Sequence, residues 1–467
     1  MQSAIKRTST AFLLSMLCLC IFSLAHLGIQ TSDDATMLAT AGAIWDDHTL
    51  AIPGMEWLSE RVSIGVKGKD GQLVAKYGLG QAVIAAGLYG IGETLLPQSD
   101  PYLWAGYPIA KSTAGATLAL FVNVLLGSLL VGLVVYEIET LHGTKAATIT
   151  GLMLILASPI WLSARGFGAE IGTAVGIVFA VMMARRALKS EASIPLWISV
   201  MGLGLAVMYR PSALAFGLAW IVWLWRRPRR DWITVGVALA IVAATVPGYD
   251  WIRYGSVFES GYGEFGSGFS LQVTGLVGYL FAPGRSLIVF APWVLLILPS
   301  AIKLLRRQID WDAGVAVGII GFYVFHSMWR EWEGGWSFGP RLLIPILPAA
   351  AIIVAPFFAK SARWTVIFFL LGSLLQVASV AIDPTTTHLN AISGEGVSFE
   401  EQVTRFRQTV WSLDGNIVIL QLKAVATPVY FVWLWLWGAM SLAWVGYIAS
   451  QSTVDTVSSV GVSPQTH

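Results

Sequence analysis

The sequence predicts an all-α protein that crosses a membrane about twelve times. Hydrophobic residues make up 56% of its 467 positions and charged residues only 12%, whereas soluble domains carry about 25% charged residues. A soluble fold could not bury so much apolar surface behind so few charges. The net charge of +2 gives no footprint for nucleic acid. Two cysteines are too few for a disulfide scaffold.

A helix needs about 20 largely apolar residues to cross a bilayer, and twelve stretches approach that length. We expect spans at 11–29, 114–136, 146–162, 171–187, 196–209, 212–225, 232–250, 286–302, 313–328, 341–359, 364–382 and 426–449. The first could be a cleaved signal peptide, but its length favours a retained anchor. Arg210-Pro211 separates the fifth and sixth stretches, which could instead form one re-entrant hairpin.

Basic residues orient the predicted bundle with both termini in the cytoplasm. Short inner connections are enriched in Lys and Arg, and the basic run at 226–230 is the strongest such signal. If the apolar segment 79–97 also spanned the membrane, this run would face outward. We therefore expect 79–97 to lie at the outer interface. The sequence predicts a multi-pass protein of the plasma (inner) membrane with its long loops outside.

The predicted loops divide the chain into three regions. Residues 1–360 hold most spans and a large outer loop at 30–113 that carries interfacial helices. Residues 361–449 hold the last spans and an outer loop at 383–425. The Ser/Thr/Val-rich tail at 450–467 is expected to be disordered. Because the inner connections are short, any chemistry should lie in the outer loops.

Two adjacent acids, Asp33 and Asp34, directly follow the first span. One explanation is capping, because Ser32 or an Asp can cap a helix over 35–45 and acids suit its positive end. The other is catalysis. Two carboxylates at the exit of a span are costly to hold there, and one could take a proton from an attacking hydroxyl.

Cations near the outer ends of spans form a second group of candidates. Lys76 is either a snorkelling anchor at the interface or a ligand for a phosphate. Six arginines lie where the positive-inside rule disfavours them, which indicates an anionic ligand: Arg165, Arg210, Arg253, Arg285, Arg330 and Arg341. We expect roughly half to be structural, paired with nearby acids. The candidate acids are Asp250, Glu170, Glu331 and Glu333.

Two aromatic, glycine-rich loops could form the rim of a site. Trp332 and Trp336 lie in the irregular segment 329–341, and Tyr254 opens the segment 254–262. The tryptophans suit an aromatic belt at the membrane surface, but indole faces also pack well on sugar rings and polyprenyl chains. For the second segment, a plain ordered loop is as consistent as a substrate rim.

Motifs for several other chemistries are missing from the sequence. It contains no P-loop, no Gly-x-Gly-x-x-Gly after a strand and no Cys/His cluster with metal-ligand spacing. We expect neither a cofactor nor a divalent metal. A nucleotide-sugar would be cytosolic, whereas the loops are predicted outside. An activated sugar donor for these loops should therefore be lipid-linked.

In their order along the chain, these features resemble the C-type (GT-C) membrane glycosyltransferases, in particular the branch of protein O-mannosyltransferases and aminoarabinose lipid A transferases. The resemblance covers roughly residues 11–360. It rests on Asp33-Asp34, Lys76-Tyr77-Gly78-Leu79-Gly80, Arg210-Pro211, Arg253-Tyr254-Gly255-Ser256 and Gly335-Trp336-Ser337-Phe338-Gly339-Pro340-Arg341. Three positions depart from the family pattern: Asp34 replaces the usual Glu, Met37 replaces a frequent aromatic, and the lysine motif lacks its proline.

The resemblance implies an enzyme that moves a sugar from a polyprenyl-phosphate carrier to an acceptor hydroxyl by direct inverting displacement. Asp33 matches the family's catalytic acid and would be the base, while Asp34 would orient the acceptor or the base. The donor phosphate would be held by Lys76 and Arg341, with Arg285 and Arg165 as further candidates. The substrate rim would comprise Tyr77, Glu170, Tyr254, Trp332 and Trp336. The implied partners are the lipid-linked donor, a glycan, lipid or protein acceptor, and membrane lipids.

Two hypotheses without catalysis stay open. A transporter or flippase for lipid-linked sugars or other lipids would explain the arginines and tryptophans without a base, and its function would survive Asp33→Asn. A structural membrane subunit would respond to changes at Asp33, Lys76 or Arg341 only through its stability.

Overall fold

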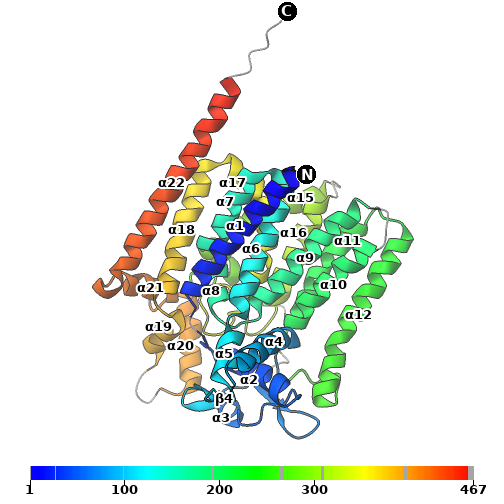
Figure 1. Cartoon of the computed structure of the whole chain (residues 1–467), viewed down its shortest axis with the longest axis vertical. Coiled ribbons are helices and arrows are strands. Elements are labelled where there is room, and N and C mark those ends of the chain that lie inside the picture. Colours follow the sequence, from blue (N-terminus) through cyan, green and yellow to red (C-terminus); the bar gives the residue numbers. More distant parts are fainter. Residues whose placement is uncertain are drawn as a thin grey trace, which may run out of the picture.

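The computed structural model describes residues 2–26, 28–97, 99–190, 194–262, 268–270, 272–306, 310–393 and 397–460. Its long helices stand side by side, and short helices and hairpins gather at one end of them, here called the loop end (Figure 1). The N-terminus and the connection between α11 (Leu218–Leu224) and α12 (Arg229–Tyr254) lie at the opposite end. The basic run at 226–230 is therefore at the end away from the loops.

Among the residues that the structure describes, six helical stretches are long and apolar enough to cross a membrane. They are α5 (Thr113–Leu120) with α6 (Val122–His142), α9 (Glu170–Leu188), α12, η4 (Arg341–Ile346) with α17 (Leu347–Lys360), α18 (Ala362–Ala381), and η5 (Pro428–Tyr430) with α22 (Phe431–Val460). Five shorter apolar helices accompany them, lying in α1 (Gln2–Leu24), α7 (Thr144–Leu156), α10 (Ile194–Tyr209), η1 (Pro211–Gly217) with α11, and η3 (Pro292–Ile297) with α15 (Leu298–Leu305). The helix α16 spans Trp311–Ser327. These findings support an all-α membrane protein, and the number of twelve spans stays a prediction.

Small residues let α9 and α10 pack closely enough to bring two site residues together. A Cβ atom on Gly176 would lie 2.5 Å from the backbone nitrogen of Ala206, so the backbones approach to a distance that only glycine allows. The helix α10 ends at Tyr209, and Pro211 forces Arg210 into an extended conformation. As a result, Arg210 at the end of α10 meets Glu170 at the start of α9.

The segment between α1 and α5 folds into a small unit at the loop end. It contains α2 (Ser32–Asp46), α3 (Glu56–Ser59), α4 (Leu79–Leu95) and two antiparallel hairpins, β1 (Gly65–Lys67) with β2 (Leu73–Ala75) and β3 (Tyr102–Trp104) with β4 (Tyr107–Ala110). The helix α4 packs on α2 and α5 through buried side chains such as Leu38, Ala85 and Tyr89. The segment 79–97 therefore packs with the loop end, and its place at the outer membrane interface stays a prediction. The hairpins were not predicted, because strands of three or four residues leave little periodicity.

Short helices from later parts of the chain complete the loop end. They are α8 (Ile160–Arg165), α13 (Val273–Phe281), α14 (Leu287–Phe290), α19 (Pro384–Ile392), α20 (Phe399–Trp411) and α21 (Ile417–Val425). The helix α22 continues to Val460, so the predicted tail begins as helix, and residues 461–467 lie outside the described part of the chain.

Candidate active site

The helix α2 begins with a capping box that fixes the direction of both acids. Thr31 is the N-cap, and its hydroxyl accepts from the Asp34 backbone N–H at 3.2 Å. Asp34 Oδ2 in turn accepts from the backbone N–H groups of Gln30 and Thr31 at 3.1 and 3.2 Å. The expectation that Ser32 caps the helix is wrong, because Thr31 is the N-cap and Ser32 is the first helical residue. The expectation that an Asp caps it is confirmed by Asp34, although the helix begins earlier than residue 35. Because Asp34 supplies the side chain of the capping box, the Asp33 side chain takes no part in the cap and can contact other segments.

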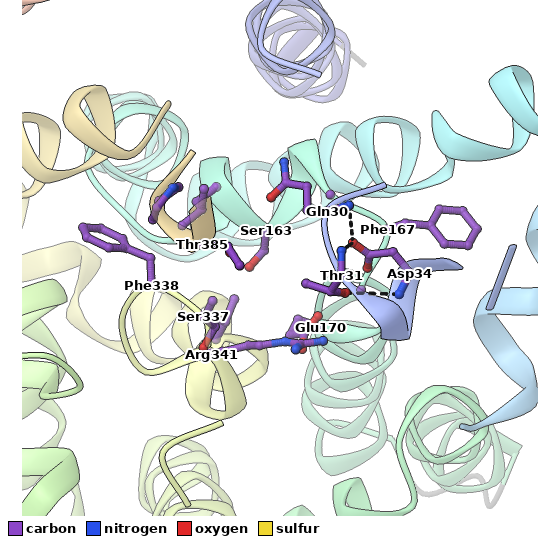
Figure 2. A pocket seen from close by; sticks show the side chains of 15 residues that line it. Gln30, Thr31, Asp34, Ser163, Phe167, Glu170, Ser337, Phe338, Arg341 and Thr385 are labelled. Atoms are coloured by element: carbon purple, nitrogen blue, oxygen red, sulfur yellow. Dashed lines mark hydrogen bonds and ion pairs between the residues drawn. The ribbon is translucent and has the colours of Figure 1, made fainter. Parts of the chain in front are cut away.

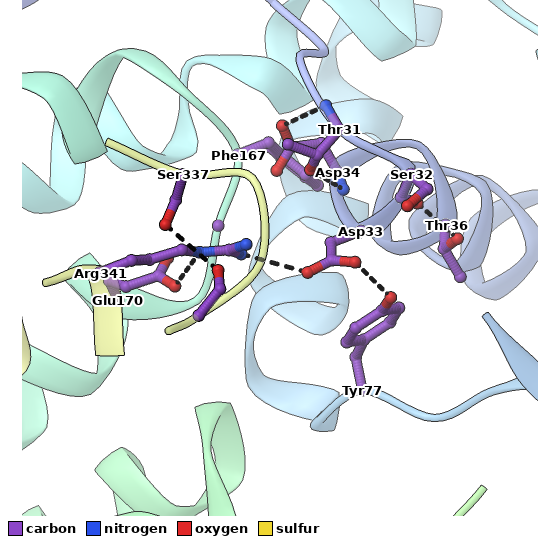
Figure 3. A network of polar contacts seen from close by, with 12 residues as sticks. Thr31, Ser32, Asp33, Asp34, Thr36, Tyr77, Phe167, Glu170, Ser337 and Arg341 are labelled. Carbon is purple, nitrogen blue, oxygen red and sulfur yellow. Dashed lines mark hydrogen bonds and ion pairs between the residues drawn. The ribbon is translucent and has the colours of Figure 1, made fainter. Parts of the chain in front are cut away.

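Asp33 points toward two polar side chains from distant parts of the chain (Figure 3). Its Oδ1 accepts from the Tyr77 hydroxyl at 2.6 Å, and its Oδ2 lies 3.3 Å from Arg341 Nη2. The Asp33 side chain keeps 30% of its surface exposed. The carboxylate is thus held in place and is still accessible to a ligand.

Arg341 joins this carboxylate to a second, buried one. Its Nε donates to Glu170 Oε1 at 2.7 Å, and Arg210 Nη2 donates to the same oxygen at 2.8 Å. The turn that aims Arg341 depends on Gly339, whose φ of +75° disfavours any side chain and whose Cβ would collide with Phe290 at 2.8 Å. One buried acid thereby fixes two arginines at the loop end.

Lys76 is a third cation near these acids, in addition to Arg341 and Arg210. Its ammonium donates to the Ser63 carbonyl and lies 5.4 Å from the Tyr77 ring and 5.0 Å from the Tyr262 ring. Burial lowers the pKa of Lys76, and the opposite charge of Asp33 raises it in part. Aromatic faces and a carboxylate therefore stabilise this half-buried cation.

The two acids have opposite electrostatic surroundings. Burial favours the neutral form of Asp33, but Arg341, Lys76 and the Tyr77 hydroxyl outweigh it and hold the pKa of its carboxyl below the usual range. For Asp34, burial prevails over Arg341 and the Gln30 N–H, and raises the pKa to about 6. At neutral pH, Asp33 is ionised, and Asp34 titrates close to that range.

A pocket of about 70 Å³ opens beside this network (Figure 2). Four separate segments form its walls: the start of α2, the end of α8 with the following loop, the turn before α17 and the start of α19. Its polar lining residues are Gln30, Thr31, Asp34, Ser163, Glu170, Ser337, Arg341 and Thr385. The pocket thus shares Arg341 and Glu170 with the ion-pair network.

The structure brings Asp33, Asp34, Lys76, Tyr77, Glu170 and Arg341 together, but the other two predicted phosphate ligands make different contacts. Arg285 is fully buried and donates to the backbone carbonyls of Glu333 and Gly335 at 2.7 and 3.0 Å. Arg165 is also fully buried and donates to the Ser379 carbonyl at 2.9 Å. Both bind backbone carbonyls in the described structure, although Nε and Nη2 of Arg165 have no partner there. Their role as phosphate ligands stays a prediction.

Of the predicted rim residues, Tyr77 and Glu170 belong to the network around Asp33 and Arg341, whereas Tyr254 and the two tryptophans make other contacts. Trp332 is buried against Tyr279, with ring centroids 5.3 Å apart. Trp336 stacks on Phe406 at 5.7 Å. Tyr254 donates from its hydroxyl to the Ala75 carbonyl at 2.9 Å, which supports the strand next to Lys76. Glu170, expected at the rim, instead lies at the centre of the arginine network.

Arg210 and Tyr262 lie near Asp33 and Lys76, but neither was assigned to the candidate site from the sequence. Arg210 stood among the six outer arginines, and the helix break at Arg210-Pro211 was the signal that could have placed it beside the acids. Its Nη1 is buried and has no hydrogen-bond partner in the described part of the chain. Tyr262 ends the aromatic segment 254–262, which the sequence offered as a possible rim, but only the fold brings its ring to Lys76.

Within the described residues, no three His, Cys, Asp or Glu side chains gather in a way that could hold a metal ion. Arg341 lies between the carboxylates of Asp33 and Glu170, where it supplies the opposite charge. The expectation that no metal is needed stays a prediction.

The helix bundle with this site at its loop end has the fold of the C-type membrane glycosyltransferases. One of the similar solved structures is the crystal structure of ArnT from Cupriavidus metallidurans bound to undecaprenyl phosphate, with a TM-score of 0.50 and 14% identity over 97% of this chain and 81% of that one. No family model matches the sequence, and no curated protein does.

Two further solved structures align with TM-scores below 0.5. The oligosaccharyltransferase of Archaeoglobus fulgidus gives 0.46 at 10% identity, over 89% of this chain and 55% of that one. The arabinosyltransferase EmbB of Mycobacterium smegmatis gives 0.45 at 14% identity, over 94% of this chain and 41% of that one. This chain spans only about half the length of these two proteins.

Proposed function

We propose that the protein is a glycosyltransferase that moves a sugar from a polyprenyl-phosphate-linked donor to an acceptor hydroxyl at the outer face of the membrane. The observation that carries the proposal is the convergence of an ionised, partly exposed Asp33 with Arg341 and Lys76. A carboxylate beside fixed cations suits a reaction that needs both a base and a site for a departing phosphate.

The proposed reaction is a single displacement. The acceptor oxygen attacks the anomeric carbon and forms the new glycosidic bond, while Asp33 takes the hydroxyl proton. The bond between the anomeric carbon and the phosphate oxygen breaks, and both of its electrons leave with the polyprenyl phosphate. Attack from the side opposite the leaving group inverts the anomeric centre.

The phosphate is proposed to bind Lys76 and Arg341, with Arg210 as the third cation. Arg210 is preferred to Arg285 and Arg165 because it already shares Glu170 with Arg341. Fixed cations stabilise the charge that develops on the leaving phosphate, because they need no reorganisation during the reaction. Neither a cofactor nor a metal is part of this proposal.

The membrane placement belongs to the same proposal. The loop end would face outward and both termini the cytoplasm, because the basic run at 226–230 lies at the other end of the bundle. The carrier lipid would reach the site sideways from the bilayer. A glycan, a lipid or a protein could be the acceptor, and the sugar could be a hexose or a pentose.

The decisive experiment is transfer in vitro by the purified full-length chain. A panel of polyprenyl-phosphate mannose, glucose and arabinose serves as donors, and the wild type is compared with Asp33→Asn. The proposal expects transfer by the wild type and loss of turnover in the variant. Lipid movement across vesicles that survives Asp33→Asn, with no transfer from any donor, would favour the flippase hypothesis instead.

A further inference from the structure

The pocket beside Asp34 has the chemistry of a binding site for hydroxyl groups. Asp34 Oδ2 is used by the capping box, but Oδ1 accepts no hydrogen bond from any described residue. The amide nitrogen of Gln30 is buried and likewise has no partner in the described structure. An unused acceptor and an unused donor therefore belong to residues that line one small cavity, which is the arrangement a hydroxyl can satisfy.

Hydroxyl side chains from other segments extend this polar lining. Ser163 comes from α8, Ser337 from the turn before α17 and Thr385 from α19 (Figure 2). The Ser163 hydroxyl makes no hydrogen bond within the described chain, and Thr385 donates only at 3.3 Å to a backbone carbonyl. Groups that can both donate and accept are suited to a ligand that carries hydroxyls.

The charge of the pocket argues against an anionic ligand. Its two acids, Asp34 and Glu170, face one lining cation, Arg341, which is already paired with Glu170 and Asp33. A phosphate entering here would meet carboxylates and no unpaired lining cation. Of the three cations proposed to bind the donor phosphate, Arg341 lies at the edge of this pocket, whereas Lys76 and Arg210 do not line it.

Size restricts the ligand further. A volume of about 70 Å³ holds roughly five water-sized groups, since each needs about 10–15 Å³. A hydroxymethyl group fits this space, and the rest of a sugar can extend out of the pocket because one side of it is open.

From these observations we infer that the pocket receives the hydroxyl-bearing end of an uncharged, sugar-like acceptor, which Asp34 and Ser163 orient toward Asp33. The inference rests on the proposed function and names the substrate class of its second substrate. It also separates the two substrates: the donor phosphate binds on the side of Lys76 and Arg210, and the acceptor binds on the side of Asp34. Arg341 lies between the two and contacts Asp33.

The test measures binding by the full-length chain in lipid nanodiscs. The probes are methyl β-D-glucopyranoside and its 6-phosphate, titrated in the presence of undecaprenyl phosphate. The inference expects the uncharged probe to bind at least tenfold more tightly than the phosphorylated one. It also expects Ser163→Leu, which fills the pocket, to weaken the uncharged probe at least tenfold while the Kd of undecaprenyl phosphate stays within twofold.

Two further variants show whether a loss of sugar binding comes from filling the pocket or from a folding defect. Ser59→Leu makes the same change at a half-buried serine of α3 that does not line the pocket, and should leave the sugar Kd unchanged. If Ser163→Leu fails to bind undecaprenyl phosphate, and so to fold, Thr385→Leu fills the pocket from another element. Equal or tighter binding of the phosphorylated probe, or unchanged sugar binding in the filled pocket, overturns the inference. Absence of both undecaprenyl phosphate binding and transfer would instead refute the proposed function itself.

Discussion

Arg341 Nη2 lies 3.3 Å from Asp33 Oδ2, so the turn before α17 and the first turn of α2 meet in one ion pair (Figure 3). The same guanidinium donates from Nε to Glu170 at 2.7 Å. One cation is therefore shared between two carboxylates. Under the proposed function, a donor phosphate competes for Arg341 and releases Asp33 to act as the base.

The substitution Asp33→Asn should separate catalysis from binding. Turnover should fall by about 100-fold or more, because positioned general bases contribute about that much. The Kd of undecaprenyl phosphate should not rise, since the change removes a negative charge near the phosphate. Steady-state kinetics and lipid titration provide the two readouts. Asp47→Asn, at an exposed ion pair beyond the other end of α2, is the matched control. Full turnover in Asp33→Asn would exclude Asp33 as the base.

The substitution Tyr77→Phe should shift the pH profile of transfer. The Tyr77 hydroxyl is one of the groups that hold the pKa of Asp33 below its usual range. Its removal raises that pKa, so the acidic limb of kcat/KM should move to higher pH by about one unit, the equivalent of one hydrogen bond to a charged group. Activity well above the limb should be kept. A shift to lower pH would contradict the assignment of the limb to Asp33.

The substitution Glu170→Gln should destabilise the fold because two arginines depend on one buried carboxylate. Only 3% of the Glu170 side chain is exposed, and both guanidinium groups lie within 2.8 Å of its Oε1. Loss of the charge leaves two cations facing each other, at a cost of about 3 kcal/mol in the free energy of unfolding. Unfolding in detergent by increasing denaturant provides the measurement. Glu401→Gln breaks an exposed pair with Arg405 and should cost less than about 1 kcal/mol.

Lys76 and Arg285 should respond differently to substitution, although the sequence suggested one role for both. Lys76→Gln should raise the KM for the polyprenyl-phosphate donor about tenfold, the loss of about 1.4 kcal/mol of charge-assisted binding. Arg285→Lys should lower stability without changing that KM, because the guanidinium bridges backbone carbonyls of the turn around Gly334. A large rise in donor KM for Arg285→Lys would restore Arg285 as a phosphate ligand.

The sequence was sufficient for the membrane class and for the position of the acids, because both depend on local composition. Asp33-Asp34 directly follows a span, and Lys76 directly precedes α4, so their neighbourhood at one end of the bundle follows from the order of the spans. The contact between Asp33 and Arg341 is also consistent with this order, since both lie at ends of predicted spans.

The sequence alone could not indicate which of several similar arginines would pair with a carboxylate. Arg165, Arg210, Arg285 and Arg341 all lie near the ends of spans, and only the packing decides which guanidinium meets a carboxylate and which meets backbone carbonyls. The close packing of α9 on α10 and the turn at Gly339 make that choice. Both are tertiary features that no local pattern records.

The orientation in the membrane can be tested with two single cysteines. Cys18 and Cys20 are first replaced by alanine, and a cysteine is introduced either at the exposed Pro228, beside the basic run, or at Phe258, which is 96% exposed in the loop after α12. In intact cells a membrane-impermeant maleimide should label position 258, because the loop end is proposed to face outward. Position 228 should react only after permeabilisation, because the positive-inside rule keeps the basic run in the cytoplasm. The reverse pattern would place Asp33 and its cations in the cytoplasm and refute transfer at the outer face.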